Sequence, residues 1–340
     1  MSLFRKVLLG IGGVIILLTL AAYLLPRNVH VERSTVIAAP RATVFTIVNS
    51  FTHFNKWSPW AALDPTAKYT FEGPVAGVGA RMSWVGEPST MGSGSQIITA
   101  STPWETVTTD IDFGPQGKAT GRFTLTAQGP ATHVVWALDT DLGMNPVSRY
   151  FGLMFESMVG KDFERGLAGL KKLAEGLPKG DFADLQIEVA RVTPFTVAYV
   201  PTSSGKDGAS FAAAVAQAYG EVGAFMKSQK LNQAGAPITI DTGVSETGYQ
   251  FDAAIPVDKS PAKAVAADSR VHVKVTYGGK VLKVALKGPY SQISSTYDKI
   301  VAYIAAHGIE TNGNSWDECA NDPTAVKESE ILTNIYFPIK

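Results

Sequence analysis

The chain has a single cysteine and no excess of charge of either sign. Among its 340 residues, Lys+Arg and Asp+Glu both number 30, so the formal net charge is zero. Cys319 alone excludes an intramolecular disulfide, a cysteine zinc cluster and a CxxC redox pair. A protein that binds a nucleic-acid backbone needs a basic face. Because no run of Lys or Arg occurs, we expect no nucleic-acid partner.

The sequence also lacks the short motifs of common enzymes. None of the patterns HExxH, GxSxG, GxxxxGK[ST] or GxGxxG occurs. Asp110-Ile-Asp112 and Asp139-Thr-Asp141 resemble the polar faces of strands more than a calcium loop. Histidines are few and not at metal-ligand spacing: His30, His53, His133, His272 and His307. We therefore expect neither a metal nor a cofactor.

A long apolar run opens the chain. Val7–Leu25 contains no charged residue, follows Arg5 and Lys6, and ends at Pro26. At ~1.5 Å per residue it spans about 28 Å, close to the ~30 Å of a bilayer core. The run predicts an N-terminal transmembrane anchor within residues 1–27, with a cleaved signal peptide as the alternative. Long domains after such an anchor are commonly translocated, so we expect a single-pass inner-membrane protein with periplasmic domains.

Residues 28–176 show the pattern of an antiparallel sheet followed by a long helix. A strand is predicted over Val29–Ile37 and a short helix over Ala42–Val48. Pro146 begins the long helix. In the strands, aromatic and aliphatic residues alternate with polar ones, as in Met82, Trp84, Ile111, Phe113, Phe123, Leu125, Val134, Trp136 and Leu138. The helix has one apolar stripe: Phe151, Phe155, Met158, Val159, Phe163, Leu167 and Leu170.

The opening VERSTVIAAPRATVFTIVNSFTHFNKWSPW and the closing MFESMVGKDFERGLAGLKKLAEG resemble the START-related helix-grip domains, the SRPBCC or polyketide-cyclase-like superfamily. The resemblance implies a cavity between the sheet and the long helix that holds a lipid or another hydrophobic molecule. The simpler alternative is that the aromatic residues fill a core. The residues expected to line the cavity are Trp84, Phe113, Phe123, Trp136, Phe151 and Phe155.

Residues 177–184 are predicted to be a linker, and residues 185–340 contain a weak internal repeat. Tyr219–Phe225 and Tyr297–Tyr303 are similar helical segments, and Phe251–Val257 is similar to Thr333–Ile339. Each half is predicted to run strand, helix, strand, strand. Two such units pair about a pseudo-twofold axis.

The second half of this repeat carries the more specific resemblance. Gly288-Pro-Tyr290, the helix Ser294–Ala306, the segment Trp316–Cys319 and the final ILTNIYFPIK are similar to the GyrI-like effector-binding domains. That family implies a central cleft for small, flat, hydrophobic and often cationic compounds, and some members hydrolyse small electrophiles. Tyr199, Tyr219, Trp316, Asn334 and Tyr336 are the expected ligand-binding residues.

Asn334 stands where the family has an acid, in a Thr-Asn-Ile context. A carboxylate in an apolar cleft attracts a cation and can act as a base, whereas an amide does neither. On strand parity, Asn334 shares its face with Tyr336. We therefore expect a neutral ligand and no hydrolysis, and we expect Asn334→Glu to strengthen the binding of lipophilic cations.

Together these features predict an α+β chain with a transmembrane helix, a helix-grip domain and a duplicated effector-binding domain. The favoured function is a membrane-anchored, non-catalytic binder of hydrophobic small molecules or lipids, with one pocket in each soluble domain. Two alternatives remain. One is a cyclase or hydrolase acting on a small amphipathic compound; the other is a ligand-responsive sensor or interaction module.

Overall fold

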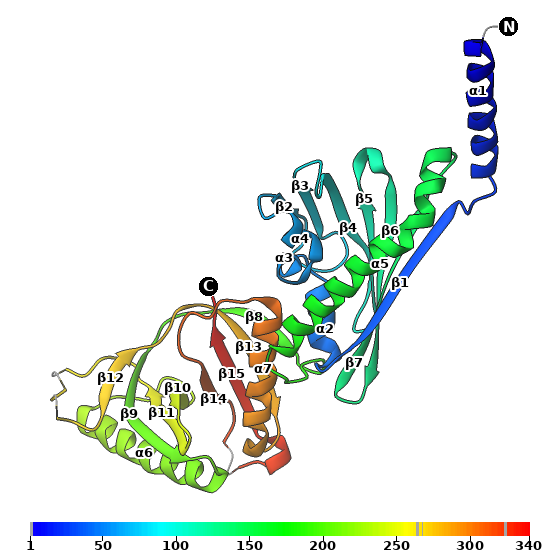
Figure 1. Cartoon of the computed structure of the whole chain (residues 1–340). Coiled ribbons are helices and arrows are strands. Elements are labelled where there is room, and N and C mark those ends of the chain that lie inside the picture. Colours follow the sequence, from blue (N-terminus) through cyan, green and yellow to red (C-terminus); the bar gives the residue numbers. More distant parts are fainter. Residues whose placement is uncertain (1–2, 263–264, 267, 323–324) are drawn as a thin grey trace. The chain divides into compact units, whose positions relative to one another are not determined.

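The computed structural model describes residues 3–262, 265–266, 268–322 and 325–340. The chain divides into two compact units, Met1–Ala183 with Val301–Gly308 and Asp184–Ile300 with Ile309–Lys340. Each contains one antiparallel sheet (Figure 1). The seven-stranded sheet with its helices is the first domain, and the eight-stranded sheet with its helices is the second domain. The chain is thus α+β, as predicted.

The apolar run at the start forms helix α1 (Leu3–Ala22), which ends three residues before the predicted segment does. Its charge-free part, Val7–Ala22, spans only about 24 Å at ~1.5 Å per residue, short of the ~30 Å hydrocarbon core. Across the described residues, no helix is both long and apolar enough to cross a membrane. The predicted spanning anchor, whose residues 1 and 2 lie outside the described part, is therefore not supported.

The first domain is built on a sheet in the order β1-β7-β6-β5-β4-β3-β2, antiparallel throughout. Its strands are β1 (Asn28–Ile37), β2 (Lys68–Glu72), β3 (Arg81–Val85), β4 (Ser93–Thr102), β5 (Thr106–Asp112), β6 (Lys118–Gln128) and β7 (Ala131–Asp141). The predicted alternation is confirmed on the central strands, because Met82, Trp84, Phe123, Val134 and Trp136 are all buried. One face of the sheet is therefore the core face.

Three short helices follow β1 and cover part of this face: α2 (Arg41–Val48), α3 (Phe54–Trp57) and α4 (Pro59–Leu63). A short 3-10 turn, η1 (Gly114–Gln116), joins β5 to β6. The predicted helix over Ala42–Val48 is confirmed as α2, and all residues from Ala42 to Val48 are buried.

The long helix α5 (Pro146–Glu175) begins at the predicted proline, where the Asn145 side chain accepts a hydrogen bond from the Val147 amide. Its 30 residues give a length of about 45 Å, whereas the 10 residues of β1, the strand against which it packs, span about 34 Å. The helix is therefore longer than the strand beneath it. Phe163, Leu167 and Leu170 are buried, whereas Phe151 and Met158, predicted for the same packed stripe, are 62% and 59% exposed.

The second domain has the strand order β12-β9-β11-β10-β14-β15-β13-β8. Its elements are β8 (Ile187–Val192), β9 (Thr196–Gly205), α6 (Gly208–Gln229), β10 (Ile238–Val244), β11 (Gly248–Pro256), β12 (His272–Val275), β13 (Gly279–Lys287), η2 (Tyr290–Gln292), α7 (Ile293–His307), β14 (Trp316–Cys319), η3 (Glu328–Glu330) and β15 (Leu332–Pro338). The units β9-α6-β10-β11 and β13-α7-β14-β15 are the two halves of the predicted repeat. They meet at the β10–β14 pair, in register from Ile238↔Glu318 to Ile240↔Trp316.

Both helices of the second domain lie on the same face of its sheet. Val222 and Met226 of α6 pack in one core with Val200 and Phe251, and Tyr297 of α7 contacts Phe337 with ring centroids 5.2 Å apart. The opposite face has a second apolar cluster that includes Val197, Ile238, Val281 and Trp316. The sheet therefore offers a helix-covered face and a face that no helix covers among the described residues.

Candidate functional site

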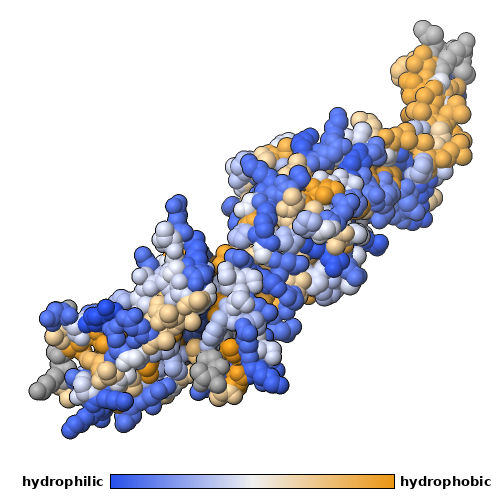
Figure 2. All heavy atoms as spheres, turned by 90° about the horizontal axis from the view of Figure 1, so that it is seen from below, coloured by the Kyte–Doolittle hydropathy of each residue, from blue (hydrophilic) through white to orange (hydrophobic). Residues whose placement is uncertain are grey.

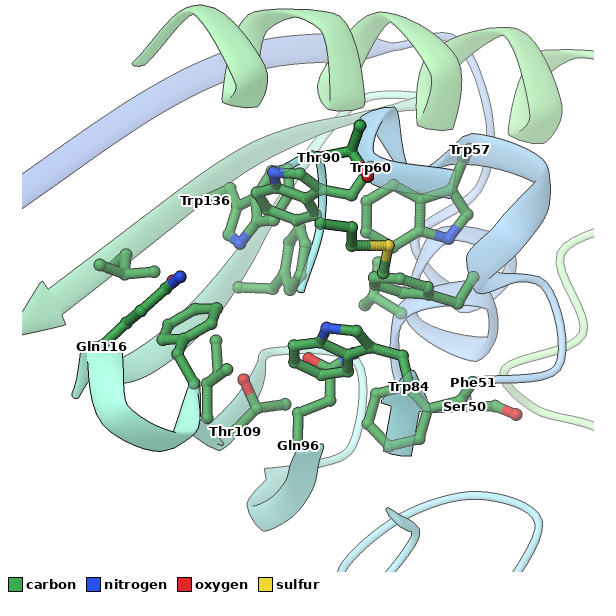
Figure 3. A pocket seen from close by; sticks show the side chains of 17 residues that line it. Ser50, Phe51, Trp57, Trp60, Trp84, Thr90, Gln96, Thr109, Gln116 and Trp136 are labelled. Atoms are coloured by element: carbon green, nitrogen blue, oxygen red, sulfur yellow. The ribbon is translucent and has the colours of Figure 1, made fainter. Parts of the chain in front are cut away.

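The core of the first domain contains a cavity of about 230 Å³. Figure 3 shows its side chains converging on one space from the sheet, from the short helices and from the loops at the sheet edge. The lining consists of Val48, Ser50, Phe51, Phe54, Trp57, Trp60, Trp84, Thr90, Met91, Gln96, Thr109, Ile111, Phe113, Gln116, Phe123, Trp136 and Leu138. This volume exceeds the ~150 Å³ of an engineered apolar cavity that binds benzene. It therefore suits a molecule somewhat larger than a single ring.

Four of the six aromatic residues predicted to line a cavity do so: Trp84, Phe113, Phe123 and Trp136. Phe151 is largely exposed, and Phe155 packs partly buried against the core without reaching the cavity. The expectation of a cavity between the sheet and the long helix is wrong in detail. The helical part of the lining comes from α2, α3 and α4, and α5 contributes no residue to it (Figure 3).

The reason is that aromatic packing fills the space beneath α5. Phe163 of α5 stacks on Trp136 with ring centroids 3.9 Å apart and an angle of 4° between the planes. Phe123 also stacks on Trp136, with ring centroids 5.0 Å apart. Trp136 therefore belongs both to the packed core under α5 and to the cavity wall, and the core-filling alternative holds for this half of the sheet.

Two glycines let indole rings lie close to the backbone in this domain. A Cβ atom on Gly94 would overlap the Trp84 ring and would lie 2.6 Å from the Asp112 carbonyl oxygen. A Cβ atom on Gly166 would lie 2.6 Å from the Trp136 ring. A side chain at either position would therefore displace an indole ring.

The cavity has polar groups but no charged residue in its described lining. The indole N–H groups of Trp57 and Trp84 are buried and have no hydrogen-bond partner among the described residues. Gln96, which is 8% exposed, also contributes an amide to the lining. A buried donor without a partner costs about 1–3 kcal/mol relative to a satisfied one. These groups therefore indicate where a polar atom of a ligand would be stabilised.

The loop that carries Thr90 and Met91 is tied down by one carboxylate. Asp64 accepts hydrogen bonds from the Glu87 amide at 2.7 Å and from the Thr90 hydroxyl at 3.2 Å. The Glu87 amide, together with Thr66, holds the pKa of Asp64 below its usual value. The charged group that is hydrogen-bonded to the lining residue Thr90 is thus the Asp64 carboxylate, an anion.

The second domain brings three of its five predicted residues together on the face that lacks helices. Trp316 and Tyr336 are paired across β14 and β15, and their rings stack with centroids 4.9 Å apart. Asn334 lies two residues along the same strand on the same face. Tyr199 belongs to this face as well, in the other half of the repeat.

Glu318 is the residue of this face that the sequence analysis missed. One carboxylate oxygen, Oε2, accepts a hydrogen bond from Asn334 Nδ2 at 2.9 Å and another from the Tyr336 hydroxyl at 2.8 Å. Burial and the Glu318 carboxylate raise the pKa of Tyr336, so its hydroxyl stays protonated and donates. Asn334 therefore holds a carboxylate in place, which removes the argument for a neutral ligand.

In the other half of the repeat the acid is Asp252, which occupies the position of Asn334, and its charge is already neutralised. Lys274 Nζ lies 2.5 Å from Asp252 Oδ2 and 4.4 Å from the centre of the Tyr199 ring. The two halves of the repeat thus differ. In one, Lys274 contacts both the carboxylate of Asp252 and the ring of Tyr199. In the other, the Glu318 carboxylate has no ion-pair partner among the described residues.

Tyr219, the fifth predicted residue, lies on the opposite, helix-covered face, and the structure does not bring it together with Trp316 and Asn334. Its hydroxyl is buried without a described partner, and burial raises the pKa of Tyr219. Side chains of α6 point into this side of the sheet, which explains why Tyr219 cannot reach the face that carries Asn334.

Asp317, which is buried, and Asp241, which is partly buried, are two carboxyl groups on that helix-covered face. The Tyr297 hydroxyl donates to Asp317 Oδ1 at 2.8 Å, and Ser315 donates to Asp241 Oδ2 at 2.7 Å. Burial, with a smaller contribution from the Asp241 charge, raises the pKa of Asp317 to about 8. Burial also raises the pKa of Asp241. At neutral pH, Asp317 is therefore mainly protonated.

No group of three or more His, Cys, Asp or Glu side chains in the described ranges is placed to hold a metal ion. Cys319 is unpaired, and burial raises the pKa of its thiol, which disfavours the thiolate. The chemistry that these two regions offer is therefore recognition through aromatic surfaces, hydrogen-bond donors and one carboxylate.

Two family matches cover the two domains. Residues 28–175 match the family described as polyketide cyclase / dehydrase and lipid transport. Residues 185–340 match the family described as GyrI-like small molecule binding domain. The order and the families are those that the sequence analysis expected. No curated protein matches the chain significantly.

Solved structures resemble each part of the chain only distantly. The EcmrR C-terminal domain is 14% identical, with 46% of this chain and 98% of that chain covered and a TM-score of 0.40. The chain in an EcmrR–DNA complex is 15% identical over 46% of this chain, at the same TM-score of 0.40, and only 57% of that longer chain is covered. Truncated norcoclaurine synthase from Thalictrum flavum is 9% identical, with 43% and 92% covered and a TM-score of 0.34.

Proposed function

We propose that this chain, which joins a polyketide cyclase / dehydrase and lipid transport domain to a GyrI-like small molecule binding domain, is a non-catalytic binder that holds a hydrophobic small molecule in the cavity of its first domain. The cavity itself carries the proposal, since it is bounded by aromatic rings. Ligand sites are typically concave and mostly apolar, with a few placed polar groups. No described lining residue is an acid, a base or a nucleophile with a base beside it.

Calorimetric titration of the full chain with naphthalene tests this function. Thr109 lines the cavity from β5, whereas Thr108 is its neighbour on the opposite face of the strand. Thr109→Phe fills part of the cavity and is expected to weaken naphthalene binding at least tenfold. Thr108→Phe, the matched control, is expected to leave the affinity within about twofold. Equal affinities in the two variants would contradict binding in this cavity.

A second function is favoured by Glu318: binding of a lipophilic cation on the second domain. Asn334 and Tyr336 both donate to Oε2, which leaves Oε1 without a described hydrogen-bond partner. The stacked Trp316 and Tyr336 rings provide a flat surface beside it. A carboxylate beside aromatic rings attracts a cation and not a neutral hydrocarbon. Tetraphenylphosphonium is the appropriate probe, and failure to bind it at low ionic strength would remove this candidate.

The proposed location is the inner membrane with the two domains in the periplasm, and α1 is the element that would make the attachment. Its side chains are apolar and largely exposed along its length, among them Leu9, Ile16 and Leu17 (Figure 2). The Tyr150 hydroxyl donates to the Leu18 carbonyl at 2.8 Å and ties α1 to α5. Fractionation of cells that produce the full chain or residues 28–340 is the test. Recovery of both in the soluble fraction would reject membrane attachment.

A further inference from the structure

The cavity of the first domain contains hydrogen-bond donors that no protein group uses. Trp57 and Trp84 are each 6% exposed, and both indole N–H groups lack a partner among the described residues. In Figure 3 the indole nitrogen of Trp84 faces the space enclosed by the labelled side chains. An entirely apolar ligand would leave these donors unsatisfied. A ligand with an acceptor would satisfy at least one of them.

Gln96 extends this polar region of the wall. It lies on β4 two residues from Gly94, the register partner of Trp84, and it is 8% exposed. Its side-chain amide has no hydrogen bond to any described protein group, and an amide can donate as well as accept. The Trp84 indole and the Gln96 amide therefore form one polar patch in an otherwise aromatic cavity.

The charge of the ligand follows from what surrounds this patch. None of the described lining residues is charged, so an ion would be taken out of water without a counter-charge, which costs far more than a hydrogen bond returns. An anion is disfavoured further, because the carboxylate hydrogen-bonded to the lining residue Thr90 is Asp64. A cation would meet indole N–H donors that point the positive end of their dipoles at it.

We infer that the cavity is selective for an uncharged, flat ligand that presents a hydrogen-bond acceptor, such as a ring carbonyl, to the Trp84 indole N–H and the Gln96 amide. This inference rests on the proposed function of the same cavity and adds the chemical class of the ligand. A volume of about 230 Å³ suits two fused rings better than a long acyl chain. The polar patch fixes the orientation of the ligand and the aromatic rings bind its faces.

The experiment compares ligands of nearly equal size in calorimetric titrations of the full chain. Coumarin has a ring carbonyl, naphthalene has no acceptor, and 2-naphthoate is charged. Coumarin is expected to bind about tenfold more tightly than naphthalene, and 2-naphthoate is expected to bind least. Trp84→Phe, which removes the indole N–H, should reduce the preference for coumarin over naphthalene to about twofold or less.

Phe113→Leu is the matched control for that variant. Phe113 also lines the cavity but has no hydrogen-bond donor, so the loss of its ring should weaken both ligands alike and preserve their ratio. Equal affinity of the unmodified protein for coumarin and naphthalene would overturn the inference and leave the proposed function standing. Tightest binding of 2-naphthoate would also overturn it. Binding of none of the three compounds would reject the proposed function together with the inference.

Discussion

The two domains solve the problem of recognising a small molecule in different ways. The first encloses a cavity whose described lining carries no charge but includes an unpartnered indole N–H and an amide. The second presents a stacked aromatic pair beside the Glu318 carboxylate, on a sheet face without a helix over it. We therefore expect the first arrangement to select shape and hydrogen-bond acceptors, and the second to select charge. The comparison predicts that the two domains take different ligands and that each can be altered without the other.

The largest expected effect is a change of folding stability with pH, and it differs between the domains because the pKa of Asp317 is raised and that of Asp64 is lowered. Burial raises the pKa of Asp317 in the folded chain from its ordinary value of 3.8 to about 8. Between these values the unfolded chain binds fewer protons than the folded one, so stability is full below about pH 4 and falls as the pH rises towards 8. The slope for one proton is about 1.4 kcal/mol per pH unit.

Unfolding of the full chain, followed by peptide-resolved hydrogen exchange between pH 5 and pH 8, measures this slope separately for each domain. The second domain should lose stability as the pH rises, and Asp317→Asn should flatten its profile. The control is Asp298→Asn, since Asp298 also lies in the second domain, in α7, but its side chain is exposed. A profile that stays unchanged in Asp317→Asn would show that this carboxyl group does not titrate in the window. In the first domain, Asp64 has a lowered pKa, and its contribution is lost only at acid pH.

The next effect disrupts the cavity of the first domain and leaves the second domain unchanged. Gly94→Ala places a Cβ atom against the Trp84 ring and 2.6 Å from the Asp112 carbonyl oxygen. We expect a loss of about 1–3 kcal/mol in the stability of the first domain, because overpacking forces side chains and backbone to shift. The displaced indole should also abolish naphthalene binding.

Denaturant unfolding followed by tryptophan fluorescence suits this measurement, since only Trp316 of the six tryptophans lies in the second domain. Gly208→Ala serves as the control, because a Cβ atom there meets nothing within 4 Å. Binding of tetraphenylphosphonium should be the same in both variants. If Gly94→Ala retains full stability and full naphthalene affinity, the position of the Trp84 ring does not require a glycine at residue 94.

A smaller effect removes the proposed cation site of the second domain and leaves the cavity of the first domain unchanged. Glu318→Gln keeps the shape of the side chain but removes its charge, and hydrogen bonds to charged groups contribute about 1.5–3 kcal/mol. Tetraphenylphosphonium affinity, measured by calorimetry, should fall at least tenfold, while coumarin binding stays unchanged. Glu246→Gln, at an exposed turn, is the matched control. Equal losses in the two variants would mean that the cation senses only the net charge of the domain.

The smallest effect is an increase in the cation affinity of the second domain. Lys283 Nζ lies 5.9 Å from the centre of the Tyr336 ring and is a built-in competitor for a cation. Lys283→Met should raise tetraphenylphosphonium affinity by about two- to fivefold, since exposed charge interactions contribute ~0.2–1 kcal/mol. Lys280→Met, on the same strand, provides the comparison. A decrease in affinity on removal of Lys283 would place the cation away from Tyr336.

Much of this architecture could be predicted from local patterns. Alternation identified the core face of the first sheet, Pro146 marked the start of α5, and the repeat gave the order of elements in the second domain. The position of the cavity could not be predicted, because it depends on α2, α3 and α4, whose packing depends on contacts distant in sequence. The helical stripe of α5 predicted a packed Phe151, but this residue is 62% exposed, and the adjacent Gly152 is the residue that faces Val29 of β1 and Leu142.

Glu318 was missed for a related reason. Its importance comes from the register Glu318↔Asn334 between β14 and β15, two strands separated by a long connection. The Thr-Asn-Ile context of Asn334 identified the position but not the group opposite it. A one-residue shift of this register would place Glu318 on the other face. The information lies in strand pairing, which the sequence of neither strand contains by itself.

The ring stack of Phe163, Trp136 and Phe123 has a mechanical consequence. Phe163 belongs to α5, which has no side chain in the cavity lining, and Trp136 and Phe123 belong to the lining. Stacked rings transmit displacement because closely packed groups cannot be compressed. The cavity wall and the long helix therefore move as one body. A ligand that widens the cavity must push on α5, and a strain applied to α5 from outside must reach the ligand.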